Sequence, residues 1–171
     1  MPAATRHPAK KTLKGIKLLL LDVDGVMTDG GIYFSDRGDE LKKFNIHDGY
    51  GITKLRKSGV EVGIVTGRSS SLVARRAEEL GIKELYQNVE NKLAVYEQIK
   101  TKLSRSDREI AYIGDDEPDI PVMKKVAFAA CPANASSIVR RQSDFVCRNR
   151  GGEGAVREVI DLILESQSRG A

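Results

Sequence analysis

The sequence predicts an α/β fold, a three-layer sandwich built on a mainly parallel sheet. Two observations support this prediction. Short apolar runs typical of strands alternate along the chain with segments of helical periodicity. Acidic, hydroxyl and basic side chains also follow several predicted strands directly, and folds of this class bind ligands at the carboxyl ends of their strands.

The first half of the chain alternates strands with helices around one insertion. The run Leu18 to Leu21 indicates a strand buried on both faces of a parallel sheet. Ile52 and Leu55 mark the inner face of a helix, and Gly81 is a typical helix stop. The predicted elements are a strand at 16–22, hairpin legs at 31–35 and 40–44 around a turn at 36–39, a helix at 48–59, a strand at 60–66, a helix at 69–80 and a short strand at 85–87.

The second half continues the same alternation. Leu93, Tyr96, Ile99 and Leu103 recur at helical spacing and define one buried side. The predicted elements are a helix at 91–103, a strand at 110–113, a short helix at 118–125, strands at 126–130 and 144–146 with a helix between them, and a closing amphipathic helix at 153–166. Together the two halves predict a Rossmann-like architecture in which the hairpin is the one insertion.

Length and composition favour one soluble domain. The 171 residues are 40% apolar and 30% charged, and we expect a domain over 16–166, a flexible segment at 1–15 and a tail at 167–171. Trp is absent, which argues against a base-stacking nucleic-acid surface. No segment approaches a membrane span, and Cys131 and Cys147 lack zinc-site spacing. We therefore expect a cytoplasmic protein that binds neither nucleic acid nor membrane.

Two carboxylates, Asp22 and Asp24, follow the first predicted strand. Alternate side chains of extended backbone point the same way, so both can face one site. Carboxylates at the end of a buried strand repel each other unless a cation joins them. The plain alternative is an exposed acidic loop after a core strand, and the pair alone leaves both interpretations open.

A second acidic segment, Gly114-Asp-Asp-Glu-Pro-Asp119, follows the strand at 110–113. Alone it could be an acidic turn with a helix N-cap. Combined with Asp22 and Asp24 it predicts a cage of hard oxygen ligands suited to Mg²⁺. No His or Cys cluster competes for a softer metal.

Two further segments supply groups that suit an anion. Thr66 offers a hydroxyl, Gly67 an accessible N–H, and Arg68 a planar fork for carboxylate or phosphate. A turn that leads into a helix would explain these three residues equally well in isolation. Lys92, at the start of a predicted helix, is by default a solvated lysine, but phosphoryl chemistry beside a carboxylate needs a fixed cation.

The order DxDG, TGR, a lone Lys and GDDxxD resembles the haloacid dehalogenase superfamily of phosphotransferases, over residues 16–165. Within it, the segments at 29–34, 44–51, 66–69, 80–82 and 154–158 look like the 3-deoxy-D-manno-octulosonate 8-phosphate phosphatases, which act in lipopolysaccharide core sugar biosynthesis. Glu153 departs from the arginine that is common in that family.

The resemblance implies a role for each matching residue. Asp22 would attack phosphorus to form an aspartyl phosphate, and Asp24 would act as general acid and then base. Thr66 and Lys92 would hold the phosphoryl oxygens. Mg²⁺ would bind the Asp22 carboxylate, the Asp24 carbonyl and Asp115, with Asp116 and Asp119 in support. The substrate, a sugar-acid phosphate, would contact Asp24, Asn45, Ile46, His47, Asp48, Gly49, Gly67, Arg68, Arg76 and Lys92.

The resemblance also bears on assembly. Larger relatives carry a cap domain over the site, whereas here only the β-hairpin stands in its place. Members of this kind are tetramers, in which hairpins and tails of neighbours help close the site. We therefore expect a homo-oligomer, namely a homotetramer.

Three alternatives remain beside this interpretation. The same chemistry could act on a nine-carbon, sialic-type sugar acid phosphate. A receiver-like signalling domain also uses Asp, Thr, Lys and Mg²⁺, but it has its acid pair on the first strand, its phosphorylated Asp on a later one, and Thr before Lys at the far end. The third alternative is a catalytically inactive scaffold, and the intact set of acids argues against it.

Overall fold

The computed structural model describes residues 13–168. Its central sheet has six strands, all parallel, in the order β5-β4-β1-β6-β7-β8. This topology confirms the predicted α/β class. The strands are β1 (Leu18–Leu21), β4 (Glu61–Val65), β5 (Glu84–Tyr86), β6 (Ile110–Ile113), β7 (Phe128–Cys131) and β8 (Phe145–Val146).

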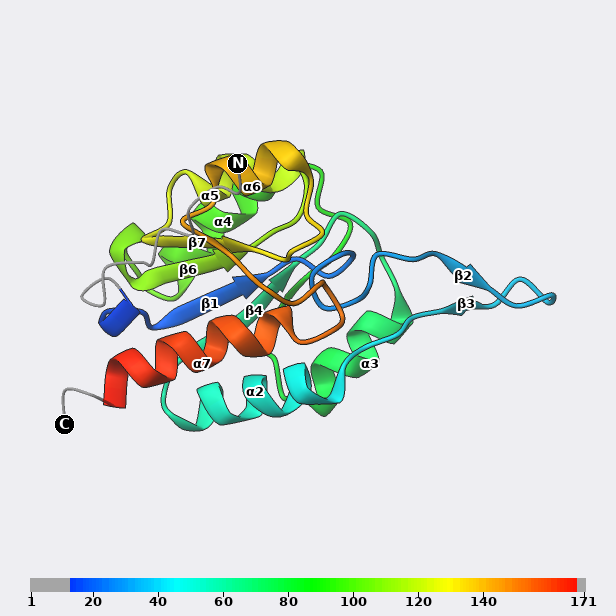
Figure 1. Cartoon of the computed structure of the whole chain (residues 1–171), viewed down its shortest axis with the longest axis horizontal. Coiled ribbons are helices and arrows are strands. Elements are labelled where there is room, and N and C mark those ends of the chain that lie inside the picture. Colours follow the sequence, from blue (N-terminus) through cyan, green and yellow to red (C-terminus); the bar gives the residue numbers. More distant parts are fainter. Residues whose placement is uncertain (1–12, 169–171) are drawn as a thin grey trace.

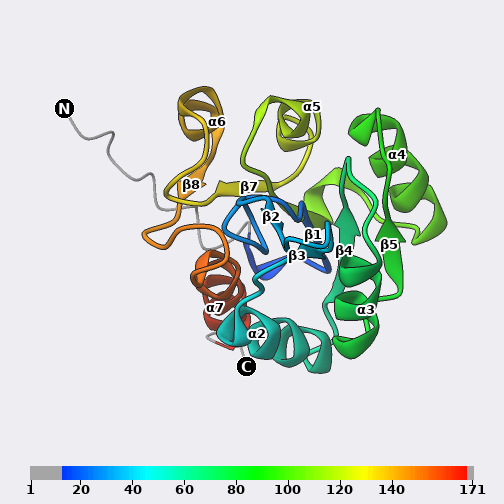
Figure 2. The ribbon, with the colours of Figure 1, turned by 90° about the vertical axis from the view of Figure 1, so that its right-hand side faces the viewer.

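Helices cover both faces of the sheet and complete the predicted three layers, as the end-on view shows (Figure 2). One layer contains α2 (Ile46–Lys57), α3 (Ser71–Glu79) and α7 (Ala155–Ser168), and α2 lies beside α7 (Figure 1). The other layer contains α4 (Lys92–Lys102), α5 (Ile120–Met123) and α6 (Ser137–Gln142). Two short 3₁₀ turns, η1 (Asp107–Glu109) and η2 (Glu117–Asp119), flank β6.

Strand β1 lies in the middle of the core. Leu19 and Leu21 pack in an apolar cluster with α2, α3 and α7, whereas Leu18 and Leu20 pack in a second cluster with α4, α5 and α6. All four side chains are fully buried, as predicted for a parallel strand covered on both faces. This burial holds the end of β1, and the carboxylates that follow it, in a fixed position.

The insertion after β1 is the predicted hairpin. Strands β2 (Tyr33–Phe34) and β3 (Glu40–Leu41) pair antiparallel, and a single bridge joins Thr28 to Phe44 below them. The strands are shorter than predicted, because the pairing does not extend past Leu41 to the bridge. The hairpin projects away from the body of the domain (Figure 1).

The ends of the described chain pack against the domain. Leu13 is buried, and the Gln167 amide donates a hydrogen bond to the carbonyl of Ile16. Gln167 and Ser168, assigned by sequence to the tail, are the last residues of α7. Most of the predicted flexible segment, and the rest of the tail, lie outside the described residues. Between residues 13 and 168, no helix has the length and apolar character to cross a membrane.

Candidate active site

Three neighbouring strands bring the predicted catalytic groups to one edge of the sheet. Asp22 follows β1, Thr66 follows β4, and Asp115 follows β6 after one glycine. Since β1 lies between β4 and β6, their carboxyl ends are adjacent. Lys92 is the first residue of α4, the helix that follows β5. The structure therefore gathers residues that are far apart in the sequence at the edge where this fold class binds ligands.

Three carboxylates form a compact cluster at this edge. Oxygen atoms of Asp22, Asp115 and Asp119 lie within 4.8 Å of one another, and this is the only such acidic or His/Cys group in the described chain. The oxygens of Asp119 also bind several hydrogen-bond donors. Its Oδ1 accepts from Lys92 and from the Tyr112 hydroxyl, both at 2.6 Å, and its Oδ2 accepts the N–H of Asp115 at 3.0 Å. The Asp119 carboxylate is therefore occupied by hydrogen bonds within the protein. The carboxylates of Asp22 and Asp115 are the ones left to bind a ligand.

The cluster concentrates negative charge in a buried place. Burial, and then the charge of Asp119, raise the pKa of Asp22 to about 6 in spite of Lys92. Burial, and then Asp22 and Asp119, raise the pKa of Asp115 to about 8. These shifts mean that the ionised cluster is unfavourable without a cation. A set of carboxylate oxygens of this kind fits Mg²⁺, which offsets the repulsion and prefers hard oxygen ligands.

Lys92 is the fixed cation of the site. Its Nζ lies 3.1 Å from Asp22 Oδ2 and 2.6 Å from Asp119 Oδ1. Burial alone would lower the pKa of Lys92, but the charges of Asp22 and Asp119 outweigh it and raise that pKa. The lysine is therefore charged, although its side chain is almost wholly buried. Such a cation beside a nucleophilic carboxylate can also hold an oxygen of a bound phosphoryl group.

The loop after β1 is shaped for close approach. Gly25 has a φ of +87°, and a side chain at this position would collide with the Asp115 carboxylate. The Thr28 hydroxyl accepts the N–H groups of Gly25 and Gly30, both at 3.3 Å. Asp22 in turn accepts the N–H of Val23 at 2.7 Å. The DxDG sequence is thus required here because only glycine lets the two acidic loops meet.

Asp24 faces the base of the hairpin. Its Oδ1 lies 2.6 Å from the Nζ of Lys42, the residue that follows β3. Glu40 lies 3.4 Å from the same Lys42 nitrogen and 2.9 Å from the guanidinium of Arg68. The structure therefore brings two predicted site residues, Asp24 and Arg68, to one network of charges that sequence analysis did not identify.

The predicted sugar-binding segment lies at the start of α2. Asn45 caps this helix by accepting the N–H groups of His47 at 2.8 Å and Asp48 at 3.2 Å. Arg76 approaches it so closely that a side chain at Gly49 would collide with the guanidinium. This contact places Arg76 next to the segment with which it was predicted to act.

Other members of the predicted set point elsewhere. Asp48 is buried and accepts the N–H of Arg157 at 2.8 Å, so its carboxylate is directed at the start of α7. The Ile46 side chain is exposed. Gly67 is exposed in the loop between β4 and α3. The residues of the Asn45 to Gly49 segment therefore have different roles: Asn45 caps α2, Asp48 accepts a hydrogen bond from α7, and Ile46 faces solvent.

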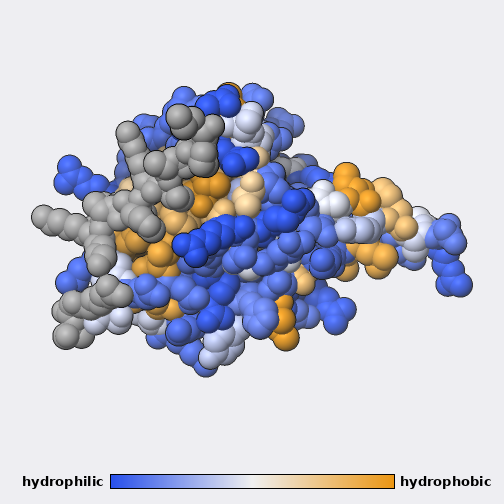
Figure 3. Space-filling model, in the orientation of Figure 1, coloured by the Kyte–Doolittle hydropathy of each residue, from blue (hydrophilic) through white to orange (hydrophobic). Residues whose placement is uncertain are grey.

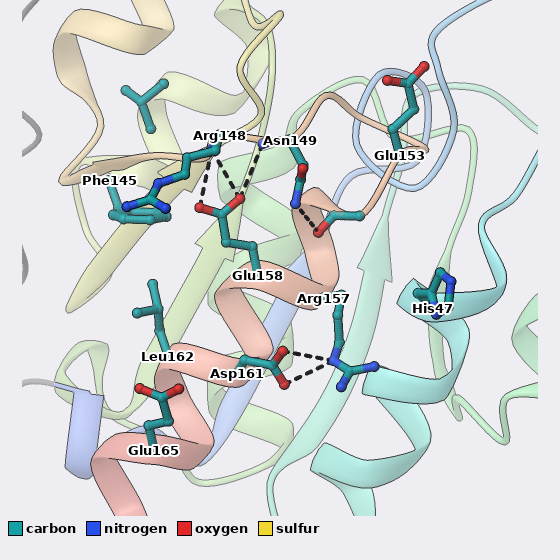
Figure 4. A pocket seen from close by; sticks show the side chains of 12 residues that line it. His47, Phe145, Arg148, Asn149, Glu153, Arg157, Glu158, Asp161, Leu162 and Glu165 are labelled. Carbon is teal, nitrogen blue, oxygen red and sulfur yellow. Dashed lines mark hydrogen bonds and ion pairs between the residues drawn. The ribbon is translucent and has the colours of Figure 1, made fainter.

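His47 lines a separate groove of about 570 Å³ along α7 (Figure 4). Glu158 accepts the N–H groups of Arg148 and Asn149 here, and Arg157 pairs with Asp161 at 2.9 Å. Glu153 lies at one end, and its carboxylate points away from the other lining side chains (Figure 4). None of the clustered aspartates lines this groove, so it is distinct from the acidic site.

Sequence analysis missed Lys42 and Tyr112 and underrated Asp119. Lysine in a hairpin leg is normally solvated, so its type carries no signal. Tyr112 lies in the strand predicted at 110–113 but was given no role there, and its hydroxyl donates to Asp119. A polar tip inside a buried strand, just before an acidic segment, is the signal that could have revealed it.

Comparison with known proteins agrees with this geometry. The profile of the haloacid dehalogenase-like hydrolases matches residues 51–126. The 3-deoxy-D-manno-octulosonate 8-phosphate phosphatase KdsC of Escherichia coli K12 is 47% identical over 156 residues, which are 91% of this chain and 83% of KdsC. The crystal structure of the Yersinia pestis phosphatase of that name has a TM-score of 0.91 at 45% identity and covers 94% of this chain and 86% of its own.

A third relative was crystallised with ligands. The 3-deoxy-D-manno-octulosonate 8-phosphate phosphatase of Moraxella catarrhalis, in complex with magnesium, phosphate and KDO, has a TM-score of 0.91 at 41% identity, covering 94% of this chain and 92% of its own. Identity at this level over almost the whole of both chains shows common membership. The chain therefore belongs to the haloacid dehalogenase-like hydrolases, in the family of the 3-deoxy-D-manno-octulosonate 8-phosphate phosphatases.

Proposed function

We propose that this protein is a Mg²⁺-dependent phosphatase that releases phosphate from 3-deoxy-D-manno-octulosonate 8-phosphate, in lipopolysaccharide core sugar biosynthesis. The observation that carries the proposal is the cluster of Asp22, Asp115 and Asp119 with the buried Lys92 at the strand ends. The substrate comes from the relatives, which are named for it, and one of which was crystallised with KDO.

The chemistry follows from the two carboxylates of the DxDG loop. Asp22 attacks phosphorus through a carboxylate oxygen while the bond from phosphorus to the sugar oxygen breaks. Asp24 donates its proton to that oxygen, so that the sugar leaves as an alcohol. Asp24 then takes a proton from water as the water attacks the aspartyl phosphate, and phosphate leaves with Asp22 restored.

The remaining groups bind and orient the phosphoryl group. Lys92 is charged and already in contact with Asp22, so it can hold a phosphoryl oxygen next to the nucleophile. Thr66, buried at the end of β4, and the N–H of Gly67 would hold the others. Asp22 and Asp115 and, by family analogy, the Asp24 carbonyl would hold Mg²⁺, which would neutralise charge so that an anionic nucleophile can approach an anionic phosphate.

The substrate has a carboxylate as well as a phosphate. We assign the sugar acid to Arg68, Arg76 and the backbone of the Asn45 to Gly49 segment, because the Asp48 carboxylate is directed at α7 and His47 lines the separate groove. The contact of Arg76 with Gly49 supports this grouping, because it joins the cation to the segment. We also propose that the protein acts in the cytoplasm and that it is a homotetramer. The tetramer is supported by the exposed apolar side chains of the hairpin and by the lack of a cap domain over the site among residues 13–168.

A panel of phosphorylated sugars tests this proposal. We expect the kcat/KM for the eight-carbon sugar acid phosphate to exceed that for hexose 6-phosphates by about 30- to 5,000-fold, which corresponds to about 2–5 kcal/mol for a desolvated Arg–carboxylate contact. Preference for a nine-carbon sugar acid phosphate would move the assignment to that alternative. Equal values for acids and hexoses would contradict both.

Arginine variants connect this preference to the structure. Arg68→Ala and Arg76→Ala should each reduce the gap between sugar acids and hexoses, because the acid loses a carboxylate partner that the hexose never had. Arg75→Ala is the matched control, since Arg75 is an exposed neighbour on α3 that pairs with Glu79. If the arginine variants slow both substrate types equally, neither arginine recognises the carboxylate.

A further inference from the structure

The base of the hairpin reaches the acidic site through one buried lysine. The side chain of Lys42 is 2% exposed, and its Nζ lies 2.6 Å from Oδ1 of Asp24. Lysine is almost never buried to this degree unless it is paired. Removing a lysine from water is unfavourable, so this contact is a built feature of the site and unlike an incidental surface ion pair.

Local backbone geometry explains the direction of Lys42. Glu40 and Leu41 are the two residues of β3, and alternate side chains of a strand point to opposite sides. Lys42 contacts Glu40, whereas Leu41 and Lys43 are exposed. Leu41 is accordingly exposed at 56%. Glu40 in turn lies 3.4 Å from Lys42 and 2.9 Å from Arg68. The four side chains form an alternating row of charges, in the order Asp24, Lys42, Glu40, Arg68.

The neighbouring charges in this row restrain the position of the Lys42 ammonium group. Glu40 is itself held by Arg68, and it limits the freedom of the Lys42 ammonium group. Lys42 therefore presents a fixed donor to one oxygen of Asp24. An aspartate with one oxygen held in this way can turn only its second oxygen, Oδ2, toward a bound substrate.

We propose that Lys42 is a positioning residue for Asp24, a role that rests on the proposed phosphatase function. Lys42 orients the carboxyl group so that Oδ2 carries the proton to the leaving oxygen. In that step the Oδ2–H bond breaks, a new O–H bond forms on the sugar oxygen, and the electrons of the broken P–O bond move to that oxygen. Lys42 itself touches neither phosphorus nor the leaving group.

The leaving group of the substrate distinguishes this role from others. An alkyl phosphate needs a proton on its departing oxygen, whereas p-nitrophenyl phosphate releases a stable phenolate without one. The value of kcat/KM covers the steps up to transfer of the phosphoryl group to Asp22, so it excludes the later hydrolysis. Three substrates are therefore compared, namely the sugar acid phosphate, a hexose 6-phosphate and p-nitrophenyl phosphate.

The informative variant is Lys42→Met, which keeps the apolar stem and removes the ammonium group. We expect its kcat/KM to fall about 10²-fold for both alkyl phosphates, since misplacement of a catalytic group by about 1 Å has an effect of this order. For p-nitrophenyl phosphate we expect a change of less than about 3-fold, because no proton is needed. Lys42→Arg should restore most of the alkyl phosphate activity, and Lys43→Met, on the outward side, should match wild type.

Each other outcome overturns the proposal. A loss confined to the sugar acid would make Lys42 a ligand for the substrate carboxylate. Equal losses on all three substrates would make it a support for the loop as a whole, and no loss would make the contact inert. If Lys42→Met fails to fold, Lys42→Arg and Lys42→Gln are compared by the same ratio of hexose to aryl phosphate. That ratio needs no sugar acid turnover, so a wrong substrate assignment is recognised separately by the panel.

Discussion

At the scale of the single residue, Asp22 has two properties that a carboxylate nucleophile requires. It is buried at the end of a fully packed strand, so its position is fixed. One of its oxygens is held by the N–H of Val23 and the other faces Lys92 at 3.1 Å. Burial also raises its pKa to about 6, so the ionised form costs free energy here, and a bound cation would favour that reactive form.

Replacing Asp22 by Asn should remove turnover and leave the fold intact. An amide is a poor nucleophile, so we expect kcat to fall by at least about 10³-fold. The Asn side-chain oxygen can still accept the N–H of Val23, so circular dichroism and thermal unfolding should remain like those of wild type. Glu117→Gln, an exposed acid in the η2 turn, is the control. Near-normal turnover by folded Asp22→Asn would rule out Asp22 as the nucleophile.

Mg²⁺ should stabilise the protein as well as activate it. At a concentration about 100 times its Kd, a ligand that binds only the folded state adds about 2.7 kcal/mol, or roughly 5–10 °C in Tm for a chain of this size. Chelation should abolish turnover, and Ca²⁺ should restore it poorly because it favours higher coordination numbers. Asp115→Asn should lose most of the Mg²⁺-dependent Tm shift, while Glu117→Gln keeps it. An identical shift in both variants would place the ion elsewhere.

At the scale of elements, α2 and α7 are joined by a buried carboxylate. Asp48, in the first turn of α2, accepts the N–H of Arg157 in the first turn of α7. Burial raises the pKa of Asp48 to about 6, although backbone N–H groups of Arg157 and Gly154 oppose the shift. The raised pKa means that the folded protein binds this proton more tightly than the unfolded chain, whose pKa is 3.8. The contribution of Asp48 to stability is therefore least favourable above pH 6 and improves as the pH falls toward 4.

This linkage predicts a pH-dependent effect of Asp48→Asn. A difference of about two pKa units corresponds to at most about 3 kcal/mol. Relative to wild type, Asp48→Asn should be more stable at pH 7.5 than at pH 4.5, that is, the difference in free energy of unfolding (variant minus wild type) should be larger at pH 7.5 by up to that amount. Chemical denaturation of both proteins at the two pH values measures it, with the exposed Asp36→Asn as the control. Parallel pH curves for wild type and Asp48→Asn would show that the carboxylate is not destabilised by burial.

At the scale of the whole molecule, the projecting hairpin lacks cover. Ile32 and Phe34 are exposed at 61% and 64%, and Leu41 and Tyr33 are also exposed. Figure 3 shows this apolar surface on the part that extends from the body. Burying one such side chain contributes about 1.5–3 kcal/mol, so several together can support association. The hairpin is thus the surface on which the proposed tetramer depends.

A charge within the apolar stretch should dissociate the assembly. We expect light scattering to give a tetramer for wild type and smaller species for Phe34→Asp, because the interface would have to bury an unpaired carboxylate. Arg37→Asp places the same charge in the exposed turn of the same hairpin and should remain assembled. A wild-type monomer with full activity at working concentration would contradict both the tetramer and its role in closing the site.

Some parts of the site could be predicted from the sequence and others could not. The strand β1 and its acids were predictable, because a run of leucines followed by DxDG has few structural solutions. The direction of Asp48 was not, because a residue in the first turn of a helix can face the ligand or a neighbouring helix with the same sequence. Lys42 was missed for a related reason, since its burial arises from the path of the chain between β3 and the bridge at Phe44.

By itself, the sequence determined the alternation of elements, the parallel sheet and the placement of each reactive group after a particular strand. These features depend on local periodicity and on chain order, which are read directly from residue types. The tertiary structure alone decided which charges meet: Asp119 with Lys92, Asp24 with Lys42, and Asp48 with the start of α7. Such pairings join residues up to 109 positions apart in the chain, and the energies of buried charges depend on distance and burial that no local pattern encodes.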